Sequence, residues 1–433
     1  MGSDVVIFWF RSDLRVGDNL ALAEACASAA RLLPVYCHDP AADAPTRWGF
    51  ARRGPHRRAF LEAALDDLDA ALRARGSALL ELNGAPGEVL PALARAVGTD
   101  AVVCEAIAAP AEEDELAALR AAGLRVRTVW QSSLLDPAAL PFAPARLPKV
   151  FTAFRQAVES AGLQPPAPLP AAQTLPPWPD LATGAEAAHR LRACRRSYTV
   201  EQASFPWWRS DFAGGEGAAL AHLARYFASD RPQHYKATRN GLSGIDFSSK
   251  FSLWLAQGAL SPRVAFAALR RHEAAQGVSE GSYWLWFELL WRDYFRFLHL
   301  QHGRRLYRAR GLNAAAPPPA HVPAAFEAWC EGRTGHGFID AGMRELAATG
   351  WLSNRMRQVV ASYLIHDLGC DWRAGAAWFE AQLVDYDVYS NQGNWLYIAG
   401  RGTDPRGGRR FNPQKQAAEY DPQGVYRALW AGD

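Results

Sequence analysis

Short apolar runs alternate with longer amphipathic stretches over the first 135 residues of the chain. The apolar runs are Val5–Phe10, Leu33–Cys37, Ala78–Leu82, Ala101–Cys104 and Val126–Trp130. Segments with a helical repeat, such as Pro55–Arg75 and Glu112–Ala122, separate them. Buried strands that alternate with helices are typical of a parallel, doubly wound sheet. We therefore predict an α/β domain over residues 1–135, with any ligand bound beyond the C-terminal ends of its strands.

Prolines and then helical repeats organise the rest of the chain. Residues 137–180 hold 11 of the 28 prolines, which predicts an interdomain linker over residues 136–214 with a short helix at Phe151–Ser160. From about residue 215, apolar positions recur at three- and four-residue spacing. The segments concerned are Glu216–Ser229, Ser261–His272, Ser282–His299, Phe338–Thr349, Ser353–Leu368 and Trp372–Leu383. We expect a larger all-α domain over residues 215–433.

Composition and charge narrow the class of protein. Apolar residues make up 49% of the 433 residues and charged residues 21%, as in ordinary soluble proteins with more than one domain. The net charge of +3 restricts any nucleic-acid surface to a local patch. The six cysteines show no CxxC or other tight spacing, which argues against a metal or disulfide framework and favours the cytoplasm. Without an 18-residue apolar run or a signal-peptide pattern, we expect no membrane segment.

The tryptophans are unevenly distributed. Of the 16 tryptophans, only Trp9, Trp48 and Trp130 precede residue 178. Any single tryptophan is most simply a core residue. Their concentration in one part of the chain nevertheless indicates that this part binds a flat, aromatic ligand.

One polar run suits a phosphate. Residues 234–242, followed by Ser248-Ser249-Lys250-Phe251-Ser252, place hydroxyls and a lysine at the start of a predicted helix. Exposed N–H groups and the helix dipole attract anions at such a position. Ordinary capping by serine is the alternative.

Three further runs are polar within helical surroundings. Glu288, Trp291 and Arg292 share one helix face, which predicts either a pocket for a base or a surface ion pair above a core tryptophan. The runs Gly350–Gln358 and Asp385–Tyr397 are dense in amide, carboxylate and arginine side chains. Because burying such groups unpaired is costly, they are either exposed or bind a polar ligand.

These runs resemble the photolyase/cryptochrome family, and within it the cryptochrome-DASH branch. The resemblance is carried by Phe8–Arg15, Tyr235–Leu242, Glu288–Tyr294, Asp385–Tyr397 and Gly402–Arg406. It spans nearly the whole chain and is strongest after residue 230. It implies a photolyase-like antenna domain at the N-terminus and an all-helical domain that binds FAD and DNA.

The resemblance implies a U-shaped FAD inside the helical domain. The positions that match its phosphate contacts are Tyr235, Ser248, Ser249, Lys250, Phe251 and Ser252. Arg357 and Asp385 match an ion pair beside the isoalloxazine ring, and Asp387 matches a ribose or ring contact. Asn391 matches the residue that faces flavin N5. An amide there cannot readily hand over a proton, so we expect an anionic reduced flavin.

The resemblance also implies a repair pocket. Glu288, Trp291 and Asn354 match its lesion-facing wall, where a pyrimidine dimer would be flipped in and split by an electron from excited reduced flavin. Tyr397 and Gln358 stand where photolyases of duplex DNA have Trp and Met, as in the DASH branch. The smaller aromatic wall gives less stacking to offset the cost of unpairing the dimer from a duplex. We therefore expect repair of single strands and weak or no repair of duplexes. The alternative is a blue-light photoreceptor that binds nucleic acid or a protein partner without repair.

Trp395 and Trp372 match the proximal and middle members of the family's tryptophan relay. The distal member would lie ten residues before Trp329, where this chain has a proline. Either the relay ends after two steps, or another aromatic residue, such as Trp378 or Tyr363, completes it.

Basic residues near the expected pocket mouth predict contacts with DNA phosphates. They are Arg355, Arg401, Arg406, Arg409, Arg410 and Lys415, with Tyr397 at the pocket wall. A solvated charged loop is the alternative.

An antenna and the partners complete the expectations. Glu112 or Glu113 lies where folate-binding relatives place a glutamate, although the exposed start of a helix also explains both residues. We expect a folate, 5,10-methenyltetrahydrofolate, in preference to no antenna, and no metal. The expected partner of this cytoplasmic monomer is single-stranded DNA that contains pyrimidine dimers, or another nucleic acid.

Overall fold

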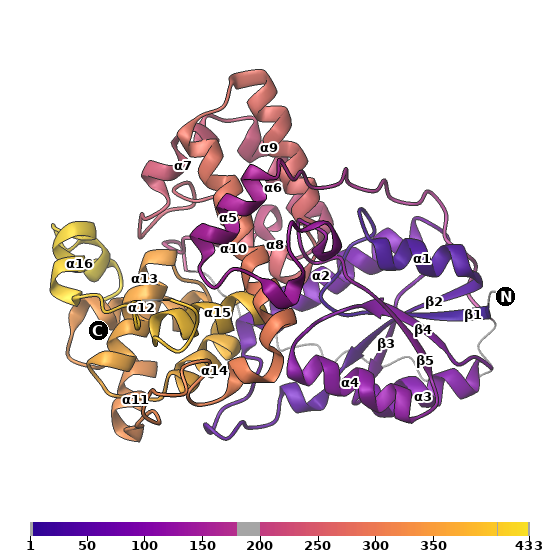
Figure 1. Ribbon diagram of the computed structural model, residues 1–433, viewed down its shortest axis with the longest axis horizontal. Helices are drawn as coiled ribbons and strands as arrows, with labels where there is room; N and C mark the ends of the chain where they lie inside the picture. The colour runs from indigo at the N-terminus through magenta and orange to yellow at the C-terminus, as the bar shows by residue number, and fades with distance from the viewer. Residues whose placement is uncertain (1–2, 180–199, 405, 432–433) are drawn as a thin grey trace.

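The computed structural model describes residues 3–179, 200–404 and 406–431, and Figure 1 shows a sheet with its helices beside a larger helical body. The sheet has the order β3-β2-β1-β4-β5, with every pair of neighbours parallel. Its strands are β1 (Ser3–Phe10), β2 (Ala29–His38), β3 (Leu80–Asn83), β4 (Ala101–Glu105) and β5 (Arg125–Val129). The predicted doubly wound parallel sheet is therefore confirmed.

Helices cover both faces of the sheet because its strands are apolar on both faces. The helices are α1 (Leu20–Ser28), α2 (Pro55–Arg73), α3 (Pro86–Ala96) and α4 (Pro110–Ala121). Phe8 and Phe10 pack with residues of α1 and α2 in one core, whereas Ile7 and Trp9 pack with residues of α3 and α4 in another. Successive residues of a strand point to opposite faces, so β1 contributes to both cores.

The proline-rich segment is mostly irregular between the two bodies. It contains two short 3-10 turns, Pro137–Ala139 and Pro144–Arg146, and the helix α5 (Phe151–Ser160), which the sequence predicted at the same residues. The part of the expected linker at 180–199 lies outside the described residues. Phe151 and Phe154 anchor α5 in the core of the helical body.

The helical body follows the pattern of three- and four-residue spacing, as expected. Its first helices are α6 (Glu216–Phe227), α7 (Arg231–Thr238), α8 (Ser252–Gln257), α9 (Pro262–Gln276) and α10 (Glu280–His302). The remaining helices are α11 (Pro323–Cys330), α12 (Gly337–Thr349), α13 (Asn354–His366), α14 (Trp372–Gln382), α15 (Val388–Ile398), α16 (Pro413–Tyr420) and α17 (Val425–Leu429). Further 3-10 turns lie at Pro40–Ala42, Ser210–Phe212 and Gly303–Tyr307.

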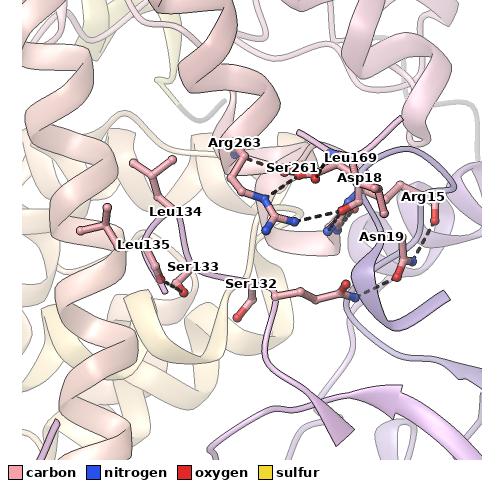
Figure 2. A network of polar contacts seen from close by, with 12 residues as sticks. Arg15, Asp18, Asn19, Ser132, Ser133, Leu134, Leu135, Leu169, Ser261 and Arg263 are labelled. Carbon is pink, nitrogen blue, oxygen red and sulfur yellow. Dashed lines mark hydrogen bonds and ion pairs between the residues drawn. The ribbon is translucent and has the colours of Figure 1, made fainter. Parts of the chain in front are cut away.

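The loop after β1 joins the sheet to the helical body. Figure 2 shows Asp18 of this loop beside Ser261 and Arg263 at the start of α9. The distance from Arg263 Nε to Asp18 Oδ2 is 2.9 Å, and both side chains are almost fully buried. Arg15 donates a hydrogen bond of 2.8 Å to the carbonyl oxygen of Gly258. The polar run after the first strand is therefore an interdomain joint that positions α8 and α9.

A second joint between the sheet and the helical body lies at α10. The carboxylate of Asp293, in the middle of α10, accepts hydrogen bonds of 2.8 Å from the backbone N–H groups of Leu134 and Leu135. Asp293 is fully buried, and burial raises its pKa to about 6 despite these two bonds. The segment that follows β5 is thus tied to the longest helix of the helical body.

Candidate functional site

A cavity of about 480 Å³ lies in the helical body, lined by side chains of α7, α8, α9, α10, α13 and α15. We call it the main cavity. The predicted site residues that line it are Tyr235, Ser248, Ser249, Lys250, Phe251, Ser252, Glu288, Trp291, Asn354, Arg357, Asp385, Asp387 and Tyr397. Asn391 and Trp395 line a smaller cavity of about 110 Å³. Asn354, Arg357 and Asp385 line both cavities, so the two adjoin.

The predicted ion pair between Arg357 and Asp385 is confirmed. Arg357 Nη2 lies 2.9 Å from Asp385 Oδ2, and Ser252 Oγ donates a hydrogen bond of 2.8 Å to the same oxygen. The other oxygen of Asp385 is buried without a hydrogen-bond partner among the described residues. A buried carboxylate oxygen that lines a cavity and lacks a donor fits a ligand that offers an N–H or O–H group.

Lys250 is the second buried group without a hydrogen-bond partner at this cavity. Its backbone adopts φ +58°, and its Nζ lies 3.8 Å from the ring centroids of both Phe247 and Trp351. No hydrogen bond to its ammonium group is found within the described part of the chain. Burial lowers its pKa well below the ordinary value, with Glu345 opposing that shift. A buried amino group at the cavity wall that lacks a hydrogen-bond acceptor fits a ligand that offers one, such as a phosphate.

The start of α8 offers less to a phosphate than the sequence indicated. The helix begins at Ser252 and has six residues. The hydroxyl of Ser252 is already bonded to Asp385, and the backbone oxygen of Ser249 contacts the ring of His222. Among the predicted phosphate-binding groups, the lysine ammonium therefore carries the stronger argument, and the helix N-terminus carries the weaker one.

The helix face predicted for Glu288, Trp291 and Arg292 does line the main cavity, but its charges are paired differently from expectation. Glu288 forms an ion pair with Arg239, the residue that ends α7. Arg292 instead donates to the backbone oxygens of Ser132 and Leu255. Burial lowers the pKa of Arg292 to about 9. The sequence placed Arg239 in the polar run at residues 234–242 but did not predict its pairing with Glu288, because α7 and α10 are separate in the chain.

Asp387 lines both the main cavity and the smaller cavity, and it has partners within the protein. It caps α15 by accepting a hydrogen bond of 2.7 Å from the N–H of Ser390. Its carboxylate also forms an ion pair with Arg296 at 2.5 Å. Burial alone would raise its pKa, but Arg296 and Arg292 lower the pKa to about 2. Asp387 is therefore an anion over the whole physiological range.

Asn391 lies in the smaller cavity with its amide oriented by the protein. Its Nδ2 donates a hydrogen bond of 3.0 Å to the backbone oxygen of Ala376 in α14. One amide hydrogen is thus used to fix the side chain, while the amide oxygen stays an acceptor. Whether this residue faces flavin N5 stays a prediction.

Trp395 contacts the rings of Trp329 and Phe379. Trp395 is nearly fully buried, and its ring lies 6.4 Å from Trp329 and 5.1 Å from Phe379, centroid to centroid. No ring contact between Trp372 and Trp395 is found in the described part of the chain, although Trp372 is buried on the neighbouring helix α14. Trp378 packs edge-on against Phe50 at 5.0 Å. The relay roles stay predictions.

Several of the basic residues are already paired. Arg409 donates from Nε to Asp404 Oδ2 at 2.7 Å and from Nη2 to the hydroxyl of Tyr397. Arg355 lies over the ring of Tyr420, at 4.8 Å. Arg410 forms an ion pair with Asp367, and Arg406 and Lys415 are exposed. Burial lowers the pKa of Arg401. Arg406 and Lys415 are therefore the members most accessible to a phosphate, and the DNA contacts of this patch stay a prediction.

A cavity of about 120 Å³ lies between the sheet and the helical body. Glu112 lines it, whereas Glu113 is exposed outside it. The buried carboxylate at this cavity belongs instead to Glu105, the last residue of β4. Neither of its oxygens has a hydrogen-bond partner among the described residues, and burial raises its pKa to about 8. Sequence reasoning missed Glu105, although a polar residue at the C-terminal end of a parallel strand is a signal for a ligand.

No group of three His, Cys, Asp or Glu residues is placed to hold a metal ion in the described part of the chain. No helix within it is both long and apolar enough to cross a membrane.

Comparisons with known proteins agree with this architecture. A family model for the FAD binding domain of DNA photolyase matches residues 284–432, and one for DNA photolyase matches residues 6–173. The chain is 44% identical to a cryptochrome DASH of Gloeobacter violaceus, covering 99% of this chain and 86% of that protein. A cryptochrome DASH of Xenopus laevis is also 44% identical, with 99% and 82% covered.

A solved structure gives the same result in three dimensions. The cryptochrome of Synechocystis sp. PCC6803 has a TM-score of 0.93 and 40% identity, and the match covers 99% of this chain and 89% of that one. The chain therefore belongs to the photolyase/cryptochrome family, in its cryptochrome-DASH branch, and its C-terminal part is an FAD-binding domain.

Proposed function

We propose that this protein uses blue light to split cyclobutane pyrimidine dimers in single-stranded DNA. The observation that carries the proposal is that one cavity joins two kinds of wall. Arg357 and Asp385 lie in the wall suited to a flavin. Trp291, Glu288 and Tyr397 form an aromatic and carboxylate wall suited to a flipped base.

FAD fits the flavin wall because that wall contains buried polar atoms without partners. Asp385 Oδ1 and Lys250 Nζ would bind polar groups of the cofactor, and the ion pair with Arg357 would hold the Asp385 side chain in place. When bound, FAD supplies the absorption of blue light and a single electron for the bond-breaking reaction. The protein's part is to hold this cofactor beside the substrate and to exclude water from between them.

The second wall would bind the damaged bases. Trp291 offers an indole for stacking, and the ring of Tyr397 stands nearly perpendicular to it, with centroids 5.9 Å apart. Glu288 and Asn354 would bind the polar edges of the pyrimidines, with Arg239 holding the Glu288 carboxylate in place. Stacking on an aromatic ring contributes roughly 1–3 kcal/mol per base, which is comparable to the cost of flipping. A tyrosine at position 397 therefore favours strands that are already unpaired.

The interdomain cavity is the place we propose for a folate antenna. The two carboxyl oxygens of Glu105, which have no partner among the described residues, would form hydrogen bonds with the polar edge of a pterin ring. Glu112 lines the same cavity and would lie near the rest of the ligand. We also propose that the protein is a monomer in the cytoplasm. The five cysteines that the structure describes are all free, which fits a reducing compartment.

Illumination of the purified protein tests the repair proposal. A dimer-containing single-stranded oligonucleotide and its duplex are illuminated with the protein under reducing conditions, and restored thymine is quantified by chromatography. We expect thymine from the single strand and little or none from the duplex. No restored thymine from either substrate would favour the photoreceptor alternative, and equal rates would refute the strand preference. Samples kept in the dark are the control.

A further inference from the structure

Trp291 stands between the main cavity and a second cavity. The second cavity has a volume of about 140 Å³, and its lining includes Phe151, Thr403 and Arg406. Trp291 and Tyr397 line both cavities, so they form a partition between them. A tryptophan in this position has two ring faces that a base could reach.

Phe151 covers one face of the indole. The rings of Phe151 and Trp291 are stacked, with centroids 3.8 Å apart and an angle of 12° between their planes. Phe151 lines the second cavity and is not part of the lining of the main one. The covered face is therefore the face on the side of the second cavity.

Phe151 is itself held firmly. It is only 5% exposed and is the first residue of α5, the helix within the proline-rich segment. The rings of Phe287 and Tyr294, both on α10, lie 5.1 and 5.8 Å from its ring in edge-on geometry. A ring fixed from several sides can fix its own neighbour, because closely packed interiors leave little room for rotation.

We propose that Phe151 is a positioning residue for Trp291, and that it leaves a single indole face open, the one toward the main cavity. This inference rests on the proposed function, in which a pyrimidine pair stacks on Trp291. A pair that enters the main cavity lies in the same space as Arg357 and Asp385. A base that stacked on the opposite face would be separated from them by the indole. Phe151 thus selects the productive binding mode.

Fluorine NMR tests the positioning without DNA. The protein is labelled with 5-fluorotryptophan, and the Trp291 signal is assigned from its loss in Trp291→Phe. In Phe151→Leu, which keeps an apolar side chain but removes the ring, we expect this signal to shift and broaden. Phe142→Leu is the matched control, since Phe142 contacts Phe154 in the same segment and has no ring contact with Trp291 among the described residues. An unchanged Trp291 signal in Phe151→Leu would overturn the proposal.

Binding in the dark tests the consequence for substrate. Affinities for a dimer-containing and an undamaged single-stranded oligonucleotide are measured by fluorescence anisotropy. We expect Phe151→Leu to bind the damaged strand about 3- to 10-fold more weakly, as the loss of one aromatic stack predicts, with the undamaged strand unaffected. Phe151→Tyr, which keeps the ring, should retain wild-type affinity. Equal losses on both strands would refute the selective role.

The two levels of failure are distinguishable. If the wild-type protein shows no preference for the damaged strand, the proposed function fails. The fluorine signal of Trp291 still decides whether Phe151 positions the indole. If the preference exists but Phe151→Leu retains it, the proposed function stands and the role of Phe151 is refuted.

Discussion

Several of the buried polar atoms without hydrogen-bond partners lie at the cavities described above, in the part of the chain that the structure describes. Such atoms are rare in folded proteins, because each costs about 1–3 kcal/mol. Asp385 and Lys250 contribute one each to the main cavity, and Glu105 contributes two to the interdomain cavity. At the scale of single residues, the protein therefore accepts a loss of stability where a ligand can compensate for it.

Asp385→Asn tests this view at the main cavity. The change keeps the volume of the side chain but removes the charge that pairs with Arg357, which costs about 3 kcal/mol for a pair of this burial. We expect a lower melting temperature and less flavin retained after gel filtration, measured as the ratio of flavin to protein absorbance. The control is Asp367→Asn, because its partner Arg410 is 67% exposed and such pairs contribute little. Retention of flavin equal to wild type would contradict the assignment.

Because of Glu105, we expect the free energy of unfolding to depend on pH. Burial raises its pKa to about 8 from an ordinary 4.5, so the folded protein keeps a proton that the unfolded chain releases. The contribution of this residue to stability therefore falls as the pH rises from 4.5 to 8. Glu105→Gln has no charge to lose, so its unfolding free energy relative to wild type should rise by about 4 kcal/mol across this range.

Denaturant unfolding at several pH values measures the difference. The exposed Glu113 at the start of α4 provides the control, because Glu113→Gln removes the same charge from a solvated position. The Glu105→Gln curves are compared with the Glu113→Gln curves at each pH. Parallel curves for Glu105→Gln and wild type would show that Glu105 is ionised in the folded protein.

At the scale of elements, short segments between helices position the site. The turn that ends α8 lies against the loop after β1, so a helix of the main cavity is fixed by the sheet. The sequence predicted most helices because apolar spacing is a local property. It did not predict how closely this turn approaches the first loop, because that contact joins residues more than 240 positions apart.

Gly258→Ala tests the close approach. Gly258 ends α8 with φ +68°, and an added Cβ would lie 1.9 Å from the backbone oxygen of Ser12. Gly162→Ala is the control, since Gly162 follows a helix end with φ +62° but has no atom within 4 Å of an added Cβ. We expect the control to lose about 1 kcal/mol from backbone strain and Gly258→Ala to lose several kcal/mol more, measured by chemical denaturation. Equal losses would show that the backbone at Ser12 moves freely.

At the scale of the whole molecule, buried polar contacts join the sheet to the helical body. Asp18, Ser261 and Arg263 form one group of contacts (Figure 2), and Asp293 with the segment after β5 forms another. The interdomain cavity lies between the same two bodies. The relative position of the two bodies therefore depends on a few charged groups as well as on apolar packing.

We predict that Asp18→Ala makes the unfolding of the sheet and of the helical body less cooperative. It leaves Arg263 buried without its partner, which costs about 3–5 kcal/mol. We expect a lower melting temperature and two separate transitions in scanning calorimetry, where the wild type shows one. Asp100→Ala removes an exposed pair with Arg125 and should change stability by less than about 1 kcal/mol. A single transition in Asp18→Ala would show that apolar contacts suffice to couple the bodies.

The sequence by itself determined most of the elements and many of the residues that line the main cavity. Alternating apolar runs gave the parallel sheet, three- and four-residue spacing gave the helical body, and four polar runs gave the residues that line the main cavity. These features were accessible because periodicity and composition act over a few neighbouring residues. The pair of Arg357 and Asp385 was named from resemblance, and the structure places the two side chains in contact.

Only the tertiary structure decided which of these residues meet and which remain unpaired. The partners of Glu288 and Trp291, namely Arg239 and Phe151, lie 49 and 140 positions away in the chain, and no local pattern links them. The sequence also could not predict the two unpaired oxygens of Glu105, because their burial depends on how the helical body covers the end of β4. Contacts between distant segments follow from the packing of whole elements, which local periodicity does not specify.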